Sequence, residues 1–308
     1  MRLAKKVIIS VVSLSLLSAG GWYGTKYCKE VAAKKRALEQ RREWLRRRKL
    51  SWDALTGVVE RQIAQFNGDV GLVIKDLAMN WQITYNKEKQ FPSASLVKLP
   101  IMLATFYAIE DGRIRLEDPV ELKGAFKTGG SGILKSAKNG TTLTIEQLIE
   151  LMITRSDNTA ANMLISMLGF DYLNTMFHKM GLSETNLSRK MMDFSLRRQG
   201  VDNYTTAEEM ASLLENLYRK KIINGTISEM CLSFLKRQQV NDRIPAELPT
   251  DAVVAHKTGL ERNVCHDVGI IFTANGDYLI CVLTKGEQGS KKAKEFISTL
   301  ALYTYSYF

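Results

Sequence analysis

Residues that bind metals or form cross-links are scarce in this chain. Its 308 residues include four cysteines and three histidines. The thiols of the main body are Cys231, Cys265 and Cys281. Their odd number, with no C-x-x-C spacing, excludes a disulfide scaffold and allows at most one internal bridge. The histidines are His178, His256 and His266. They have no metal-ligand spacing, so we expect structural roles for them and no zinc site.

Net charge is lacking over most of the chain, although the whole chain has a formal charge of +11. Residues 1–50 contain 14 lysines and arginines against three glutamates. Residues 51–308 contain 29 basic and 29 acidic side chains. A nucleic-acid-binding body carries a basic face, so no nucleic-acid partner is expected. With 45% hydrophobic and 24% charged residues, the composition is that of a globular protein.

One long apolar stretch stands at the N-terminus. A basic start, M-R-L-A-K-K, precedes 18 apolar or small residues at 7–24. This pattern is typical of a secretion signal or a membrane anchor. The region lacks an A-x-A cleavage site, and Trp22 and Tyr23 resemble an interfacial aromatic belt. We therefore expect residues 1–25 to remain as a transmembrane anchor rather than to be cleaved as a signal peptide.

A basic segment without proline or glycine follows at residues 26–50. Its sequence, C-K-E-V-A-A-K-K-R-A-L-E-Q-R-R-E-W-L-R-R-R-K, is rich in helix-forming residues and predicts a basic helical spacer. Such a helix either binds anionic lipid headgroups or is a solvated tether. Seven lysines and arginines lie between Lys26 and Arg42, so the positive-inside rule does not favour a cytoplasmic N-terminus.

The remaining sequence has strand patterns at both ends and helical patterns in the middle. After a helical stretch at 52–66, V-G-L-V-I-K-D-L and W-Q-I-T-Y-N are typical of two strands joined by a turn. Periodic apolar positions then predict a mostly helical region up to about residue 240. Strand patterns return in V-V-A-H-K-T-G, H-D-V-G-I-I-F-T and Y-L-I-C-V-L-T-K, and A-N-G-D is a hairpin signal. A helix from about 291 to 303 closes the chain.

Strands at both ends predict one antiparallel sheet that both termini build, flanked by helices, with an all-helical lobe inserted between its strands. The expected fold class is α/β, in the α+β sense. We expect a catalytic domain at 51–308. Its α/β lobe would comprise 51–92 and 250–308, and its helical lobe 93–249. Sites commonly form where two such lobes meet.

A single lysine interrupts the apolar run F-P-S-A-S-L-V-K-L-P-I-M, three residues after a serine. On a helix, residues i and i+3 lie on one face, so Ser95 and Lys98 would meet. An S-x-x-K pattern occurs about once by chance in a chain of this length. Two further tripeptides, S-D-N at 156–158 and K-T-G at 257–259, are each expected roughly 0.04 times. All three in this order make coincidence remote.

These motifs form the signature of class A β-lactamases and penicillin-binding proteins. The chain resembles the class A β-lactamase family in F-P-S-A-S-L-V-K, S-D-N-T-A-A-N, H-K-T-G and H-D-V-G-I, across about residues 51–308. The resemblance implies a β-lactamase/transpeptidase-like fold and a serine hydrolase that opens the β-lactam amide through a Ser95 acyl-enzyme. It implies no metal or cofactor, and a monomer is the default expectation. The substrates, β-lactams or acyl-D-Ala-D-Ala peptides, lie outside the cytoplasmic membrane, which implies an exported, periplasmic or extracytoplasmic domain.

The catalytic residues expected from the match to the family are Ser95, Lys98, Ser156 and Lys257. Ser95 is the nucleophile, at the start of a predicted helix where backbone N–H groups favour an anionic intermediate. Lys98 is the proton acceptor, because an amine desolvated by apolar neighbours has a lowered pKa. By the resemblance, Ser156 passes the proton to the leaving nitrogen. Asp157, beside it, is expected to be a structural hydrogen-bond acceptor for its loop.

The other motif residues are expected to bind the substrate. Asn158 offers an amide to the side-chain amide of the substrate. Lys257 and Thr258 supply a cation and a hydroxyl for its carboxylate. Gly259 allows the backbone and the substrate to approach closely.

An oxyanion hole is expected from two backbone N–H groups, those of Ser95 and Leu260. Because the backbone donates, the side chain of Leu260 should matter little. The segment G-G-S-G-I-L at 129–134 is expected to rim the site.

The chain departs from the family where the acyl-enzyme is hydrolysed. Class A enzymes use a glutamate in an R-x-E-x-x-L-N pattern, whereas the corresponding stretch here is R-K-M-M-D-F-S. This alignment places Met191 at the glutamate and Ser195 at the asparagine, and neither is an effective general base. Asp193 is the nearest carboxylate. It is a candidate deacylation base if the loop shifts, and otherwise it pairs with an arginine, which we favour.

Three functions therefore remain open. The first is a β-lactamase that recruits Asp193 or another base. The second is a D-alanyl-D-alanine peptidase acting on peptidoglycan, a reaction that related penicillin-binding enzymes perform without the glutamate. The third is a binding or sensor protein that β-lactams acylate and that stays acylated. The closer resemblance to class A places the β-lactamase first.

Overall fold

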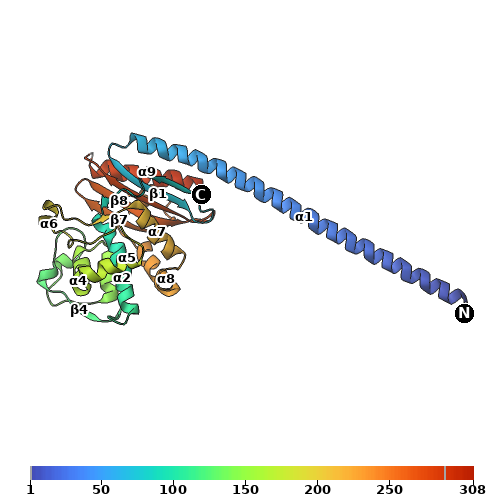
Figure 1. Cartoon of the computed structure of the whole chain (residues 1–308), viewed down its shortest axis with the longest axis horizontal. Helices are drawn as coiled ribbons and strands as arrows, with labels where there is room; N and C mark the ends of the chain where they lie inside the picture. Colours follow the sequence, from blue (N-terminus) through green and yellow to red (C-terminus); the bar gives the residue numbers. More distant parts are fainter. Residues whose placement is uncertain (1, 288) are drawn as a thin grey trace. The chain divides into compact units, whose positions relative to one another are not determined.

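The computed structural model describes residues 2–287 and 289–308, with side chains described from residue 26 onward. Contacts within the chain divide it into two units, Met1–Gly57 and Val58–Phe308. Figure 1 shows the path of the chain through both units. The predicted start of the catalytic domain at residue 51 stays a prediction.

Helix α1 spans Arg2–Gln65 without interruption. The sequence predicted an anchor, a spacer helix and a third helical stretch in this region. No proline occurs between residues 2 and 65, and no glycine between 26 and 56, so no helix-breaking proline divides the three stretches. Among the residues whose side chains are described, no helix is long and apolar enough to cross a membrane. The predicted anchor at 7–24 lies outside those residues.

The basic segment at 26–50 is helical, as predicted, and none of its side chains is buried. Arg47 pairs with Glu43, and Lys49 pairs with Asp53. The partners of each pair lie four residues apart, which is about one turn of the helix. Exposed pairs of this kind add little stability. The helix-forming composition of the segment therefore stabilises this part of the helix more than these ion pairs do.

The second unit is built on a five-stranded antiparallel sheet in the order β2-β1-β9-β8-β7. Its strands are β1 (Asp69–Asp76), β2 (Gln82–Tyr85), β7 (Val253–Glu261), β8 (Val264–Phe272) and β9 (Tyr278–Lys285). β1 pairs along its whole length with β9, from Asp69 opposite Lys285 to Asp76 opposite Tyr278. The prediction that both ends of the domain build one sheet is confirmed, as is the hairpin between β8 and β9.

Both faces of the central strands are covered. β9 is buried except at Lys285, and β8 is buried as far as Ile271. A strand with one solvated face alternates between buried and exposed residues. β8 and β9 show no such alternation, which indicates that other elements pack against both faces of the sheet. Helix α9 (Ser290–Tyr307) packs on one side of the sheet, and α7 (Ala207–Tyr218) and α8 (Gly225–Lys236) pack on the other (Figure 1).

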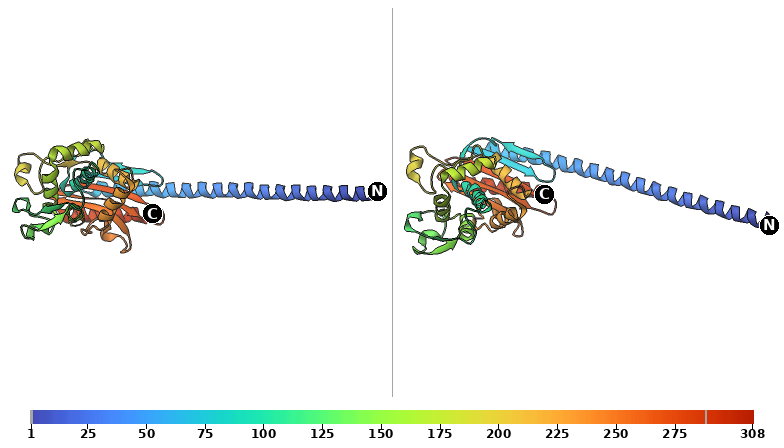
Figure 2. Two further views of the ribbon diagram at one scale, coloured as in Figure 1. Left: turned by 90° about the horizontal axis from the view of Figure 1, so that it is seen from below. Right: turned by 60° about the horizontal axis from the view of Figure 1, so that its bottom comes forward.

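The helices of the middle region gather together beside the sheet (Figure 2). They are α2 (Lys98–Glu110), α3 (Ile145–Thr154), α4 (Asn158–Leu168), α5 (Phe170–Lys179) and the short α6 (Phe194–Arg198). Two short strand pairs accompany them, β3 (Phe91–Pro92) with β6 (Tyr204–Thr205) and β4 (Pro119–Glu121) with β5 (Thr142–Thr144). One apolar core runs from Val73 and Leu279 in the sheet to Leu148 and Phe234 in the helices. Sheet and helices therefore fold as one body, and the division into two lobes stays a prediction.

The buried histidines are structural. His256 Nδ1 lies 2.9 Å from Asp267 Oδ1, and His266 Nε2 lies 2.9 Å from the Pro92 carbonyl oxygen. The backbone N–H of Thr284 donates to His266 Nδ1 at 3.0 Å. Burial lowers the pKa of His266 to about 4, so this ring is neutral and its Nε2–H donates to Pro92. The structural role expected for these two histidines is confirmed.

Candidate active site

The three sequence motifs meet beside strand β7. Ser95 lies in the 3-10 turn η1 (Ala94–Val97), which leads into α2 at Lys98. Ser156 lies just before the N-terminus of α4, and Lys257 lies in β7. A cleft of about 250 Å³ opens at this junction. Its lining residues are Ser95, Gly130, Ser131, Asn158, Met191, Met192, Phe194, Leu260, Glu261 and Arg262.

The backbone just before the serine is strained. Ala94 has a φ of +46°, in the left-handed region that residues with a Cβ rarely adopt. The 3-10 turn that follows brings residues i and i+3 into register more closely than an α-helix does. The sequence predicted that Ser95 lies at the start of an α-helix. It lies instead in the 3-10 turn, and α2 begins three residues later at Lys98. Ser95 is partly exposed, whereas Lys98 is completely buried.

The Lys98 amine is surrounded by oxygen atoms of the S-D-N motif. Nζ donates to the Ser156 carbonyl at 2.7 Å, to Ser156 Oγ at 3.2 Å and to Asn158 Oδ1 at 2.7 Å. In the described part of the chain, it makes no hydrogen bond to Ser95. Burial lowers the pKa of Lys98 to about 7, although the carboxylates of Asp157 and Glu261 oppose the shift. A large fraction of this amine is therefore neutral near neutral pH.

Ser156 connects two buried amines. Its Oγ accepts hydrogen bonds from Lys98 Nζ at 3.2 Å and from Lys257 Nζ at 3.0 Å. Lys257 Nζ also donates to the Thr258 carbonyl at 2.9 Å. Burial, and then the charge of Lys98, hold the pKa of Lys257 well below its usual range. Because both lone pairs of Ser156 Oγ are occupied, its own O–H is left to donate to a further partner.

Asp157 holds the loop at the start of α4. Its Oδ1 accepts from the backbone N–H of Ala160 at 3.0 Å and caps the helix. Its Oδ2 accepts from the backbone N–H groups of Ile133 at 2.7 Å and Leu134 at 2.9 Å. The structural role expected for Asp157 is confirmed. Gly132 has to be glycine here, because a Cβ would lie 2.2 Å from Asp157 Cγ.

Asn158 places its amide at the edge of the cleft. Oδ1 accepts from Lys98, and Nδ2 donates to the Gly129 carbonyl at 3.0 Å. One N–H of the amide nitrogen remains for a further partner. Gly130 and Ser131 line the cleft, which confirms that the 129–134 segment borders the site.

Strand β7 is an edge strand of the sheet, so alternate backbone groups point away from β8. Gly259 lies close to η1, because a Cβ there would be 3.3 Å from Leu96 Cγ and 3.3 Å from His266 Cδ2. The missing side chain thus lets η1 pack tightly against β7 and brings the serine motif next to the K-T-G motif. Thr258 is buried in this contact region, whereas the side chain of Leu260 is 45% exposed.

The loop beyond α5 presents thioethers to the cleft. Met191 is buried, and its backbone N–H donates to Asn162 Oδ1 at 2.8 Å. Asn162 Nδ2 donates in turn to the Met191 carbonyl at 3.2 Å. Met192, with a φ of +65°, lies next to Gly130, where a Cβ would be 3.0 Å from its Sδ. The position that the sequence aligns with the family glutamate therefore holds a buried methionine that is fixed through its backbone.

Asp193 caps helix α6. Its Oδ1 accepts from the backbone N–H of Leu196 at 3.1 Å. Within the described residues it forms no ion pair, so the arginine pair that we favoured from the sequence is wrong. The chain forms the short helix α6 directly after Asp193, so the carboxylate accepts a hydrogen bond from a backbone N–H of that helix instead of pairing with an arginine. Asp193 is also absent from the residues that line the cleft.

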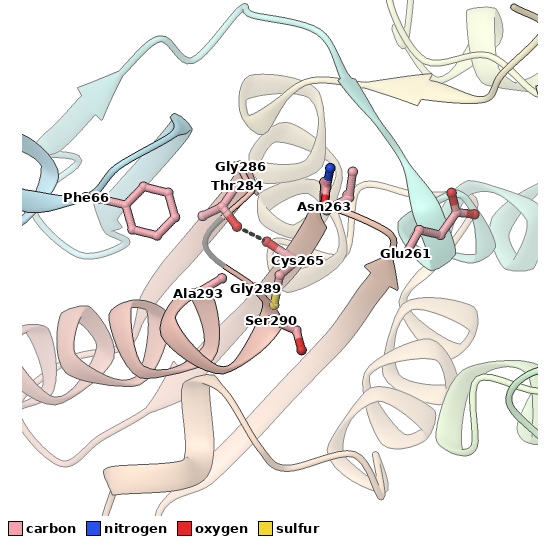
Figure 3. Close-up of a pocket in the computed structure, with 10 residues that line it drawn as sticks. Phe66, Glu261, Asn263, Cys265, Thr284, Gly286, Gly289, Ser290 and Ala293 are labelled. Atoms are coloured by element: carbon pink, nitrogen blue, oxygen red, sulfur yellow. Dashed lines mark hydrogen bonds between the residues drawn. The ribbon is translucent and has the colours of Figure 1, made fainter.

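Sequence reasoning missed Glu261, which follows Leu260 in β7. Its carboxylate lines the cleft and raises the pKa of Lys98 against the effect of burial. Glu261 also borders a second cavity of about 20 Å³, together with Phe66, Asn263 and Cys265 (Figure 3). A volume of this size holds about one water molecule, so the second cavity is not a ligand site. No spacing rule points to Glu261, because its partners lie far away in the sequence.

The sequence of this chain is similar to those of known proteins. Residues 53–308 match the beta-lactamase enzyme family. Beta-lactamase VEB-1 of Pseudomonas aeruginosa is 26% identical over 276 residues, which cover 83% of this chain and 91% of VEB-1.

Solved structures show the same fold. A beta-lactamase from Sphaerobacter thermophilus is 30% identical, with a TM-score of 0.76, and the match covers 83% of this chain and 96% of that one. A mutant of PBP-A, in an acyl-enzyme complex with penicillin G, is 28% identical with a TM-score of 0.75. That match covers 84% of this chain and 96% of the other.

Replacing Asp157 tests its structural role. Asp157→Ala removes a helix cap worth about 1 kcal/mol and leaves two backbone N–H groups without their acceptor, at about 1 kcal/mol or more each. The free energy of unfolding, measured with urea, should fall by about 3 kcal/mol. Asp193→Ala is the matched control, because it removes a cap alone and should lower the free energy by about 1 kcal/mol. Equal losses in the two variants would contradict the role of the contacts to Ile133 and Leu134.

Proposed function

Because this chain belongs to the β-lactamase enzyme family, we propose that it opens the β-lactam amide through a Ser95 acyl-enzyme and releases the acyl group slowly. The chain is a serine hydrolase of the class A β-lactamase and penicillin-binding protein type. The observation that carries the proposal is the contrast between two regions: the three motifs gather beside β7, whereas the cleft offers thioethers at the position that aligns with the deacylating glutamate. Acylation and deacylation are therefore argued separately.

Acylation begins with transfer of the Ser95 hydroxyl proton to the neutral amine of Lys98. The alkoxide oxygen attacks the carbonyl carbon, and the negative charge that forms on the carbonyl oxygen is stabilised by the backbone N–H groups of Ser95 and Leu260. When the carbon–nitrogen bond breaks, the Ser156 hydroxyl gives its proton to the leaving nitrogen. Ser156 then regains a proton from Lys98, to which it is already hydrogen-bonded at 3.2 Å.

The substrate carboxylate binds to Lys257 and Thr258 in β7. The lowered pKa of Lys257 supports this role, because a free buried cation is costly and an incoming anion offsets that cost. The remaining N–H of the Asn158 amide donates to the acyl amide of the substrate. Gly259 leaves the edge of β7 open to the ligand, and Leu260 contributes through its backbone rather than its side chain.

Deacylation lacks an evident base. Among the described residues that line the cleft, the one carboxylate is that of Glu261, and it is engaged by Arg189 and Arg197. For Asp193 to act as the base, its carboxylate would have to leave the backbone N–H of Leu196 and reach the cleft. General-base catalysis typically contributes roughly 10²–10⁴-fold to a rate. Its absence would slow the release of the acyl group and would leave the rate of acylation unaffected.

A D-alanyl-D-alanine peptidase is the second candidate. An acyl-D-Ala-D-Ala peptide offers the same amide and carboxylate as a β-lactam, and its leaving group can diffuse away from the cleft. The methionine at position 191 supports this candidate, as does the likeness to PBP-A. A sensor that stays acylated is the limiting case of the same slow release.

An exported, membrane-anchored location fits both substrates, which lie outside the cytoplasmic membrane. The apolar stretch at 7–24 would serve as the anchor, and the exposed basic helix at 26–50 would lie next to the lipid headgroups. We propose a monomer that acts without metal or cofactor.

Intact mass and colour together test the proposed function. When the full chain is mixed with a chromogenic β-lactam, we expect a rapid single burst of colour and a lasting adduct of one β-lactam per chain. Ser95→Ala should form no adduct. Rapid multiple turnover would contradict slow release, and hydrolysis that persists in Ser95→Ala would contradict the mechanism. Release of D-alanine from a peptidoglycan peptide would distinguish the peptidase from the sensor.

Restoring the glutamate tests the loop alignment. Met191→Glu should speed deacylation by about 10²-fold or more, because a carboxylate at this position can activate a water. The measurement is the rate at which the adduct disappears from the mass spectrum after excess β-lactam is removed. Asp193→Asn is the comparison: it should leave the slow release unchanged, and a further slowing would identify Asp193 as the working base.

The pH dependence of acylation tests Lys98. Only the neutral amine accepts a proton, so the acylation rate should rise with pH through about 7 and level off above it. Between pH 5 and pH 9 the neutral fraction of a group with this pKa increases about 100-fold, and the rate should follow. Stopped-flow measurement of the colour burst gives the profile. A rate independent of pH over this range would exclude Lys98 as the proton acceptor.

A further inference from the structure

Two of the sequence motifs contain residues to which the acylation mechanism gives no role. His256 precedes the K-T-G residues in β7, and Asp267 and Gly269 belong to H-D-V-G-I in β8. In the antiparallel ladder, His256 lies opposite Gly269, and Thr258 lies opposite Asp267. A Cβ at position 269 would lie 2.6 Å from His256 Cβ. The missing side chain of Gly269 therefore makes room for His256 beside Asp267.

Asp267 is completely buried and is held by two other segments. His256 Nδ1 lies 2.9 Å from Oδ1 and 3.1 Å from Oδ2, and the backbone N–H of Ile244 donates to Oδ2 at 3.0 Å. His256 Nε2 in turn lies 3.1 Å from Asn241 Oδ1. An ionised carboxylate only accepts hydrogen bonds, so the Nδ1–H of His256 is the donor. The carboxylate thus joins β7, β8 and the 241–244 segment at one point.

The hydrogen bonds of Lys257 show why its protonation state matters. Nζ donates to Ser156 Oγ at 3.0 Å and to the Thr258 carbonyl at 2.9 Å. An ammonium has three N–H groups, whereas a neutral amine has two. When Lys257 is protonated, the third N–H is available for the carboxylate of the substrate. A neutral Lys257 would have neither the spare donor nor the charge.

Positive charge and burial both act against this proton. Burial, and then the charge of Lys98 in α2, hold the pKa of Lys257 well below its usual range, and the charge of Arg243 lowers it further. Arg243 Nη1 pairs with Asp242 at 2.8 Å. Among the described groups that shift the pKa of Lys257, Asp267 is the one carboxylate, and it raises that pKa.

The thiols near Asp267 do not share its effect. Cys265 in β8 and Cys281 in β9 are both buried. Burial raises the pKa of each thiol, so neither carries a charge near neutral pH.

We propose that Asp267 is a positioning residue whose fixed negative charge, behind the K-T-G strand, keeps Lys257 a cation for the incoming carboxylate. This inference rests on the proposed function, which assigns the substrate carboxylate to Lys257. A buried ammonium without an anion nearby gives up its proton readily. Asp267 supplies that anion before the substrate arrives. Because His256 and Ile244 engage its oxygens, it leaves the Lys257 amine open to the substrate.

The test compares a chromogenic β-lactam with its methyl ester, which lacks the negative charge, on the full chain. Acylation at increasing concentration gives a half-saturation concentration and a maximal rate. Asp267→Asn keeps the size of the side chain and removes its charge. At neutral pH it should raise the half-saturation concentration of the acid about tenfold, with the maximal rate and the values for the ester within twofold of the unaltered chain.

Asp76→Asn is the matched control. Asp76 is equally buried, and its Oδ1 accepts from the backbone N–H groups of Ala78 at 2.9 Å and Met79 at 2.8 Å. This variant also removes the charge of a buried aspartate, but away from the motifs. It should change neither half-saturation concentration.

The pH dependence separates the two lysines. The half-saturation concentration of the acid should rise as pH increases through the pKa of Lys257, because the cation is lost. Without the charge of Asp267 that pKa falls, so the rise should begin about one pH unit lower. The maximal rate should keep its midpoint near pH 7, because Asp157 and Glu261 are the carboxylates that shift the pKa of Lys98.

Equal losses with acid and ester, or an unchanged half-saturation concentration of the acid, would overturn the proposal. Poor folding of Asp267→Asn cannot imitate the expected result, because the half-saturation concentration does not depend on the folded fraction. If the unaltered chain were acylated by neither compound, the proposed function would fall. Calorimetric binding of the intact β-lactam to Ser95→Ala then decides on Asp267: adding Asp267→Asn should weaken binding about tenfold, and equal binding would overturn its role.

Discussion

The burial of two lysine amines around one serine hydroxyl is the constraint on which the site depends. Two ammonium groups cannot both be held in a dry environment at so short a range without a large electrostatic cost, so burial and the charge of Lys98 lower the affinity of Lys257 for its proton. Oxygen atoms of Ser156 and Asn158 offset part of that cost. The protein thereby keeps a basic amine available near neutral pH without any histidine in the site.

This arrangement requires three distant segments to meet at close range, and small residues make that approach feasible. Gly259 lets the serine turn lie directly on β7, and Gly132 makes room for the aspartate that holds the S-D-N loop. The left-handed conformation of Ala94 directs the chain from β3 into the turn. Left-handed backbone at Ala94 and Ser156, together with two missing side chains, thus helps to convert a sheet edge and two helix ends into a reaction site.

Much of the fold and most of the site could be predicted from the sequence, because these parts leave local patterns. Alternating and periodic apolar residues indicated a sheet from both termini with helices between, and three short motifs indicated which segments meet. The cap formed by Asp193 was missed because an aspartate beside arginines fits an ion pair equally well. Glu261 was missed because its partner Arg189 lies 72 residues away, and no spacing links them. The single helix α1 was divided into three because composition changes along it while its backbone does not.

Strand β7 lies at an open edge of the sheet, and such edges invite pairing with strands of other molecules. A binding strand cannot be blocked by proline or hidden under a helix, because the substrate has to reach it. Lysine on an edge strand is one of the means by which proteins discourage such pairing. Lys257 is completely buried and its pKa lies well below its usual range, so it does not act as such an exposed edge charge. An active site on this edge therefore exposes the same backbone groups that invite pairing with another chain.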